Sequence, residues 1–186
     1  MARRRFFTSR ELALIIVLSA LGGGVSVPLG YAGSALNALP FVHFGIPQLL
    51  SGVHVLWILL VGVLVPRTGA SALTSVLKGL VELTFFSQHN IVVLLISSAE
   101  GLVMEAGLLL LGRRGPAHYV AGGLSSSSNV LVLQLTFLRG LPLPVLAYMY
   151  AASFISGAFF AGYLGVKALK TAESLSLVPS RGEDGS

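Results

Sequence analysis

Residues 69–111, GASALTSVLKGLVELTFFSQHNIVVLLISSAEGLVMEAGLLLL, form two long apolar runs separated by a short polar turn. Four ionisable residues interrupt these runs, namely Lys78, Glu82, Glu100 and Glu105. An ionisable group at the centre of a bilayer costs at least about 2.5 kcal/mol, so such groups usually line a cavity or pair with one another. The stretch therefore predicts two membrane-spanning helices that share a buried polar site.

The composition of the whole chain is that of an integral membrane protein. Of its 186 residues, 54% are hydrophobic and 10% are charged, whereas a soluble domain has about 25% charged residues. Cysteine is absent, which excludes a disulfide framework and thiolate metal sites. The formal net charge of +5 comes from arginines and lysines that flank apolar segments, so it indicates membrane topology and not a nucleic-acid partner.

Apolar runs of about 20 residues, the length that crosses the hydrocarbon core, predict an all-α membrane protein with six transmembrane helices. The expected spans are 11–30, 47–65, 69–86, 91–111, 118–137 and 143–168. Cytoplasmic loops carry an excess of Lys and Arg, which places both termini in the cytoplasm. Arg139 lies on the outer side, and the cations of the inner side are Arg3, Arg4, Arg5, Arg10, Arg67, Arg113, Arg114, Lys167, Lys170 and Arg181. Residues 1–170 form the membrane domain, and the polar tail 171–186 is predicted to be disordered.

The depths of the ionisable residues suggest how they pair. With a helix rise of about 1.5 Å per residue, Lys78 and Glu100 lie about 16 Å and 14 Å below the outer face. An ion pair between these two residues would hold both charges in the membrane. Glu82 is one turn from Lys78 on the same helix face and is the alternative partner, and a purely structural pair is the alternative to a functional one. Glu105 lies about 140° around its helix from Glu100, so we expect it to meet a neighbouring helix or a basic residue near the inner side.

Further polar and aromatic residues fall into the same outer-to-middle layer of the membrane. They are His54, Trp57, Asn129, Tyr148, Tyr150 and Ser153. Aromatic faces beside carboxylates suit a flat, cationic or amine-bearing heteroaromatic ring. The candidate substrate-binding residues of this layer are Glu82, Trp57, His54, Glu100, Asn129 and Tyr148. Interhelical packing also explains the aromatic residues, and a satisfied hydrogen bond explains His54, which has no His partner at i+3 or i+4 for a metal.

Two polar segments outside this layer complete the set of candidates. His89 and Asn90 lie in the outer turn between the third and fourth spans and are also candidate binding residues, although capping of the fourth helix explains them as well. The four serines at 125–128 are expected to pack against the backbones of neighbouring helices.

Motifs for catalysis or nucleotide hydrolysis are absent from the sequence. No G-x-x-x-x-G-K-[ST] phosphate loop occurs, so the chain cannot hydrolyse a nucleotide by that route. No G-x-S-x-G or H-E-x-x-H motif occurs either, which leaves a serine hydrolase or a zinc protease without support. We therefore expect a protein that is not an enzyme and that needs no cofactor or metal ion.

Four segments carry a resemblance to a known family. They are SGVHVLW at 51–57, VPRTGA at 65–70, LKGLVE at 77–82 and EGLVME at 100–105. In their order and in the six-span topology they resemble the substrate-binding S components of energy-coupling factor (ECF) transporters. The nearest likeness is to the YkoE-type members linked with thiamine and hydroxymethylpyrimidine, in which a Pro-Gly-Ala turn, a carboxylate late in helix three and a Glu-Gly stretch on helix four occur in the same order.

The resemblance implies a receptor subunit in a prokaryotic cell membrane. Such a receptor binds a vitamin or its precursor from outside and docks to a transmembrane coupling protein and two ATPases, with a lid formed by the loop after helix one, here residues 31–45. For close docking, helix one offers Ser19-x-x-x-Gly23 and Ala20-x-x-x-Gly24. The alternatives are a small stand-alone permease or ion-coupled channel that uses the buried Lys and Glu residues, and a membrane enzyme or assembly subunit.

Overall fold

The computed structural model describes residues 7–38, 46–85, 91–113 and 115–174, and every element within these ranges is helical. The elements are α1 (Ser9–Asn37), α2 (Ile46–Leu64), α3 (Ala70–Thr84), α4 (Val92–Leu110), α5 (Ala117–Thr136), α6 (Leu143–Gly157), the π-helical η1 (Ala158–Gly165) and α7 (Val166–Ser174). The last three form one uninterrupted helical segment, Leu143–Ser174. A helix is thus present at each expected span.

Four helical segments are long and apolar enough to cross a membrane, namely Ser9–Leu36, Ile46–Leu64, Val92–Leu110 and Leu143–Ser174. This agrees with an all-α integral membrane protein. The helix α3 has only 15 residues, and α5 carries four serines near its middle. That α3 and α5 also cross the membrane, which would make six spans, stays a prediction.

The first helix differs from its expected length. It continues to Asn37 instead of ending near residue 30, because residues 31–37 include good helix formers and no proline. The first seven positions of the expected lid loop, 31–37, therefore belong to α1 and Ala38 is its C-cap, while 39–45 lie outside the described residues. The helix α7 reaches Ser174, so the described part of the expected tail, 171–174, is helical.

The start of α1 follows from four consecutive residues. Thr8 is the N-cap, and its hydroxyl accepts a hydrogen bond from the Glu11 backbone N–H at 3.3 Å. The Glu11 carboxylate accepts one from the Thr8 backbone N–H at 2.7 Å. This reciprocal capping box satisfies two backbone donors that would otherwise lack partners at the first turn.

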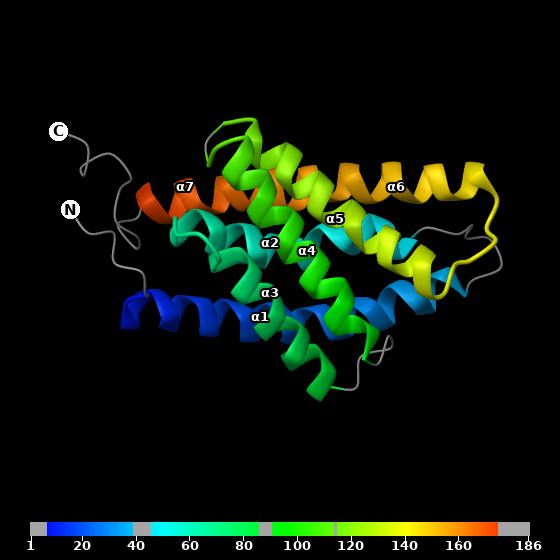
Figure 1. Cartoon of the computed structure of the whole chain (residues 1–186), viewed down its shortest axis with the longest axis horizontal. Helices are drawn as coiled ribbons and strands as arrows, with labels where there is room; N and C mark the ends of the chain where they lie inside the picture. Colours follow the sequence, from blue (N-terminus) through cyan, green and yellow to red (C-terminus); the bar gives the residue numbers. More distant parts are fainter. Residues whose placement is uncertain (1–6, 39–45, 86–90, 114, 175–186) are drawn as a thin grey trace.

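The helix α2 lies at the centre of the bundle (Figure 1), where it contacts α1, α3, α4, α5, α6 and η1. Its residues Val55, Ile58, Leu59 and Val61 are fully buried. Val55, Ile58 and Leu59 pack with Met104 and Leu108 of α4 and with Ala121 of α5 in the main apolar cluster. Val61 belongs to a second apolar cluster. Every other helix is therefore placed by its contact with α2 or with a neighbour of α2.

The first turn of α1 and the last turn of α7 lie at the same end of the bundle (Figure 1). Two ion pairs lie between elements at this end: Arg67 Nε contacts Glu11 Oε1 at 2.5 Å, and Arg113 Nη2 contacts Glu105 Oε1 at 3.1 Å. We call Glu11, Arg67, Glu105 and Arg113 the terminal cluster. Arg67 and Arg113, expected on one side of the membrane, do meet here, since Arg113 also donates to the Arg67 carbonyl at 3.3 Å. That this side is cytoplasmic stays a prediction.

Small residues bring α2, α5 and α6 close together. The hydroxyl oxygens of Ser51, Ser126 and Ser153 lie 2.7 to 3.1 Å from one another. A Cβ atom on Gly157 would overlap the Gly122 carbonyl, so the α5 and α6 backbones touch there. Ser125 donates to the Glu100 carbonyl at 2.8 Å and Ser127 to the Tyr150 carbonyl at 3.4 Å, which confirms for these two serines the expected contact with neighbouring backbones. Ser128 donates to the Ser125 carbonyl of its own helix.

Candidate functional site

A cavity of about 400 Å³ lies among helices α1 to α6. This volume falls within the range of about 300–1,000 Å³ that is typical of small-molecule sites. Most of its wall is apolar, and four titratable side chains from three helices enter it: His54, Lys78, Glu82 and Glu100. Asn129 adds an amide from α5. The expected polar site therefore exists as a cavity, and we call Lys78, Glu82, Glu100 and Asn129 the cavity cluster.

The pairing of Lys78 is settled by two distances. Lys78 Nζ lies 2.5 Å from Glu82 Oε1 and 3.9 Å from Glu100 Oε2. The expected ion pair with Glu100 is present, but Glu82, the alternative partner, is the closer of the two. The reason is the i, i+4 spacing, which puts Lys78 and Glu82 one above the other on α3. Equal depth on two different helices does not bring two side chains as close.

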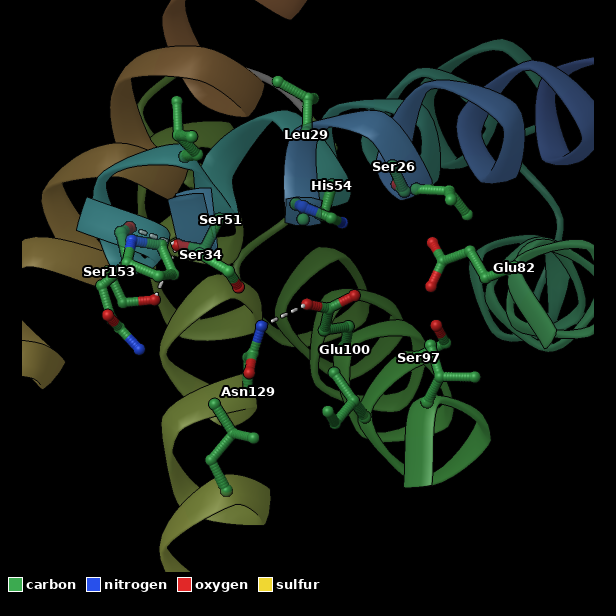
Figure 2. Close-up of a pocket in the computed structure, with 18 of the residues that line it drawn as sticks. Ser26, Leu29, Ser34, Ser51, His54, Glu82, Ser97, Glu100, Asn129 and Ser153 are labelled. Atoms are coloured by element: carbon green, nitrogen blue, oxygen red, sulfur yellow. Dashed lines mark hydrogen bonds between the residues drawn. The ribbon is translucent and has the colours of Figure 1, made fainter. Parts of the chain in front are cut away.

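The Glu100 carboxylate has weaker partners than Glu82. Asn129 Nδ2 lies 3.4 Å from Glu100 Oε1, which is long for a hydrogen bond. Within the described ranges, Glu100 Oε2 is buried and has no hydrogen-bond donor. Figure 2 shows the carboxylates of Glu82 and Glu100 directed into the same space, with His54 facing Glu100. The helices α2, α3 and α4 thus contribute an imidazole and two carboxylates to the wall of the same cavity.

Glu105 belongs to the other end of the bundle, as expected. Its Oε1 accepts from Arg113 Nη2 at 3.1 Å, and its Oε2 accepts from the Ser71 backbone N–H at 2.9 Å. Arg113 also donates to the Gly62 carbonyl. Both carboxylate oxygens of Glu105 therefore have partners, one just beyond the end of α4 and one on α3, and Glu105 does not line the cavity.

Trp57 does not reach the cavity. The α2 residues of the wall end at His54, and Trp57 lies almost one helical turn further along. Its indole packs over the backbone of α1, where a Cβ atom on Gly22 would come within 2.8 Å of Trp57 Cγ. Trp57, a candidate binding residue from the sequence, therefore does not line this cavity.

Tyr148 is also absent from the cavity wall. The α6 residues of the wall are Met149 and Ser153, which are spaced by four residues on one face. Tyr148 is turned about 100° from Met149, and its side chain is 52% exposed. Tyr150 instead donates to Gln134 Oε1 at 2.9 Å. His89 and Asn90 lie outside the described residues.

The cavity wall also contains polar residues that were not predicted from the sequence, chiefly Gln48 and Ser97. Ser97 is three residues before Glu100, and Gln48 is six residues before His54, with Ser51 between them. Spacing of three residues places side chains on one helix face. The pattern Gln48, Ser51, His54 is therefore a signal from which this wall of the cavity could have been found.

The two predicted pairs of small residues lie on different faces of α1. Ser19 donates to the Thr74 carbonyl of α3 at 3.1 Å, and Gly23 packs on Val81, also of α3. Ala20 is exposed, and a Cβ atom on Gly24 would meet nothing within 4 Å. Only the Ala20-x-x-x-Gly24 face is thus open to a partner, since the Ser19-x-x-x-Gly23 face is used inside the molecule.

The described residues do not offer a ready metal site. No group of three or more His, Asp or Glu side chains within residues 7–38, 46–85, 91–113 and 115–174 is arranged to hold a metal ion. A transition metal normally takes several such ligands. The donor set of the cavity suits an organic ligand with hydrogen-bond donors better than a bare cation.

Comparison with known proteins adds two findings. Residues 10–128 match the family described as "ABC-type cobalt transport system, permease component". A solved structure described as an S-component of an ECF transporter superposes with a TM-score of 0.82 at 20% sequence identity, over 92% of this chain and 88% of that one. A comparison with curated proteins gave no significant match. The structural likeness establishes the fold.

Proposed function

The chain belongs to the family of ABC-type cobalt transport system permease components, a family of multi-pass membrane proteins of prokaryotes, and on this premise we propose that it binds the substrate of an ECF-type importer. The S-component fold supports this role. A transport subunit also agrees with the expectation that the chain is not an enzyme. The observation that carries the proposal is the cavity with two carboxylates and one ammonium group.

The proposed substrate is thiamine, hydroxymethylpyrimidine or a related vitamin precursor. Such molecules combine a flat ring with amino groups or a positive charge. The Glu100 oxygen that has no donor among the described residues can accept from an amine, and the partly buried His54 beside it can face a ring. Apolar residues such as Ile96 and Met149 suit the ring faces. Co²⁺, named in the description of the family, is the competing candidate, and the described side chains give it no cluster of ligands.

Titration calorimetry of the purified protein with thiamine, hydroxymethylpyrimidine and CoCl₂ tests the proposal. We expect saturable binding of at least one organic compound and none of Co²⁺. Calorimetry is preferable to tryptophan fluorescence, because Trp57 lies outside the cavity. Binding of Co²⁺ without binding of either organic compound would overturn the substrate class.

We propose a transmembrane coupling protein and two ATPases as partners. The chain has no phosphate loop, so an energy source must come from other subunits. Expressed without such partners, the protein should bind its ligand but not accumulate it in cells. Concentrative uptake by the chain alone would favour the stand-alone permease.

The exposed Ala20-x-x-x-Gly24 face is the proposed contact with the coupling protein. Gly24→Leu adds bulk where nothing lies within 4 Å, so it should leave folding and ligand binding intact and reduce co-purification with the partners. The matched control is Gly23→Leu, which would collide with Val81 inside the molecule and should lower stability instead. Equal effects of both changes on stability would contradict this assignment of faces.

A further inference from the structure

The charges of the cavity cluster do not balance. Two carboxylates face one ammonium group, and all three side chains are at most 6% exposed. Removing an uncompensated charge from water costs several kcal/mol in real proteins, and two nearby carboxylates seldom both ionise. A buried site of this kind needs one more positive charge, which either a proton or a cationic ligand can supply.

The distances indicate which carboxylate takes the proton. Lys78 lies against Glu82 at 2.5 Å, so this pair is neutral as a unit. Glu100 is 3.9 Å from the same ammonium group, and its contact with the neutral amide of Asn129 is long, at 3.4 Å. Within the described residues, Glu82 Oε1 and Glu100 Oε2 are both buried without a hydrogen-bond donor, so the longer distance from the ammonium group assigns the proton to Glu100.

We propose that Glu100 carries a proton that leaves when a cationic ligand enters the cavity, so that the protein exchanges one proton for one positive charge of the ligand. The O–H bond of the Glu100 carboxyl breaks, the proton passes to water, and the carboxylate pairs with the cation. The net charge of the cavity is zero before and after the exchange. The inference rests on the proposed function, because it needs a small cationic ligand at this site.

The surroundings of Glu100 contain few other groups that could take this proton. From the helices packed around it, the titratable or charged wall residues are His54 on α2 and Lys78 and Glu82 on α3. The helices α1, α5 and α6 add only neutral side chains to the described wall, such as Ser26, Asn129 and Ser153. A proton held by His54 would balance the charge equally well, so the experiment includes that residue.

Infrared spectroscopy of the ligand-free protein tests the proton without any ligand. A carboxyl C=O band should be present in the wild type and absent from Glu100→Gln, which has the shape of the protonated side chain. It should persist in the control Glu105→Gln, since Glu105 is ion-paired with Arg113, and in His54→Gln. The proposal would be overturned if the wild type had no carboxyl band that Glu100→Gln removes. It would also be overturned if His54→Gln removed the band and Glu100→Gln did not.

Calorimetry in two buffers of different ionisation enthalpy tests the exchange. Thiamine, a permanent cation, should release about one proton per molecule bound, and its affinity should rise about tenfold per pH unit while the free protein holds the proton. Neutral hydroxymethylpyrimidine should release none. Thiamine binding without proton release would overturn the exchange. If none of the ligands bound, the proposed function would be overturned, whereas the infrared evidence for the proton on Glu100 would remain valid.

Discussion

The cavity cluster and the terminal cluster contain the same kinds of side chain in opposite arrangements. In the terminal cluster two arginines meet two glutamates, and backbone groups of Ser71, Gly62 and Arg67 add further hydrogen bonds. In the cavity cluster two glutamates share one lysine, and a buried oxygen of Glu100 has no donor within the described residues. The balanced set of charges links parts of the helix bundle, whereas the unbalanced set lines the cavity in which we propose that a ligand binds.

The largest effect is expected where a buried charge loses its partner. Lys78→Met leaves Glu82 without its ammonium group, and we expect a loss of stability at the lower end of roughly 3–5 kcal/mol, because the carboxyl can take up a proton. Thermal or denaturant unfolding in detergent measures it. The double variant Lys78→Met/Glu82→Gln should regain most of the loss. If Glu100→Gln restored the stability of Lys78→Met better than Glu82→Gln does, the 3.9 Å contact between Lys78 and Glu100 would be the dominant ion pair.

Glu100→Gln separates binding from stability in the cavity cluster. We expect the affinity for a cationic ligand to fall about 10- to 100-fold, the equivalent of a charged hydrogen bond of about 1.5–3 kcal/mol. Stability should stay within about 0.5 kcal/mol of the wild type, since the amide resembles a protonated carboxyl. Calorimetry and unfolding on the same sample check both. A large loss of stability with unchanged affinity would reverse the roles of the two clusters.

Glu105→Gln is the matched change in the terminal cluster, on the same helix as Glu100. The Arg113 guanidinium and the Ser71 N–H each lose a charged acceptor, so we expect a loss of about 1–2 kcal/mol in stability. Ligand affinity should not change, because Glu105 does not line the cavity. Reduced affinity together with normal stability would mean that the two clusters are coupled.

The smallest effect is expected at the rim of the terminal cluster. Arg67 and Glu11 have side chains that are 31% and 20% exposed, and pairs at this exposure contribute about 0–1 kcal/mol. Arg67→Gln should lower stability by less than about 1 kcal/mol, and added salt should reduce the difference. A loss larger than that of Glu105→Gln would show that the Arg67 contact, and not Glu105, closes this end of the bundle.

Much of the fold and part of the site could be predicted from the sequence. The helices stand where apolar runs predicted them, and His54, Lys78, Glu82, Glu100 and Asn129 line one cavity. Counting residues along each helix also predicts Trp57 and Tyr148 in this site, yet neither lines the cavity. Depth follows from counting residues along one helix, but facing a cavity also depends on the rotation of that helix and on where the cavity ends.

The sequence by itself determined the membrane class, the approximate helix limits and the presence of ionisable residues at mid-depth, since these properties depend on local composition and on the rise of a helix. Only the tertiary structure decided that Glu82 is the closer partner of Lys78, that Glu105 turns to Arg113, and that α1 uses one small-residue face internally and leaves the other open. Contacts between helices depend on how their faces are rotated and packed against one another, and distances in the sequence do not contain that information.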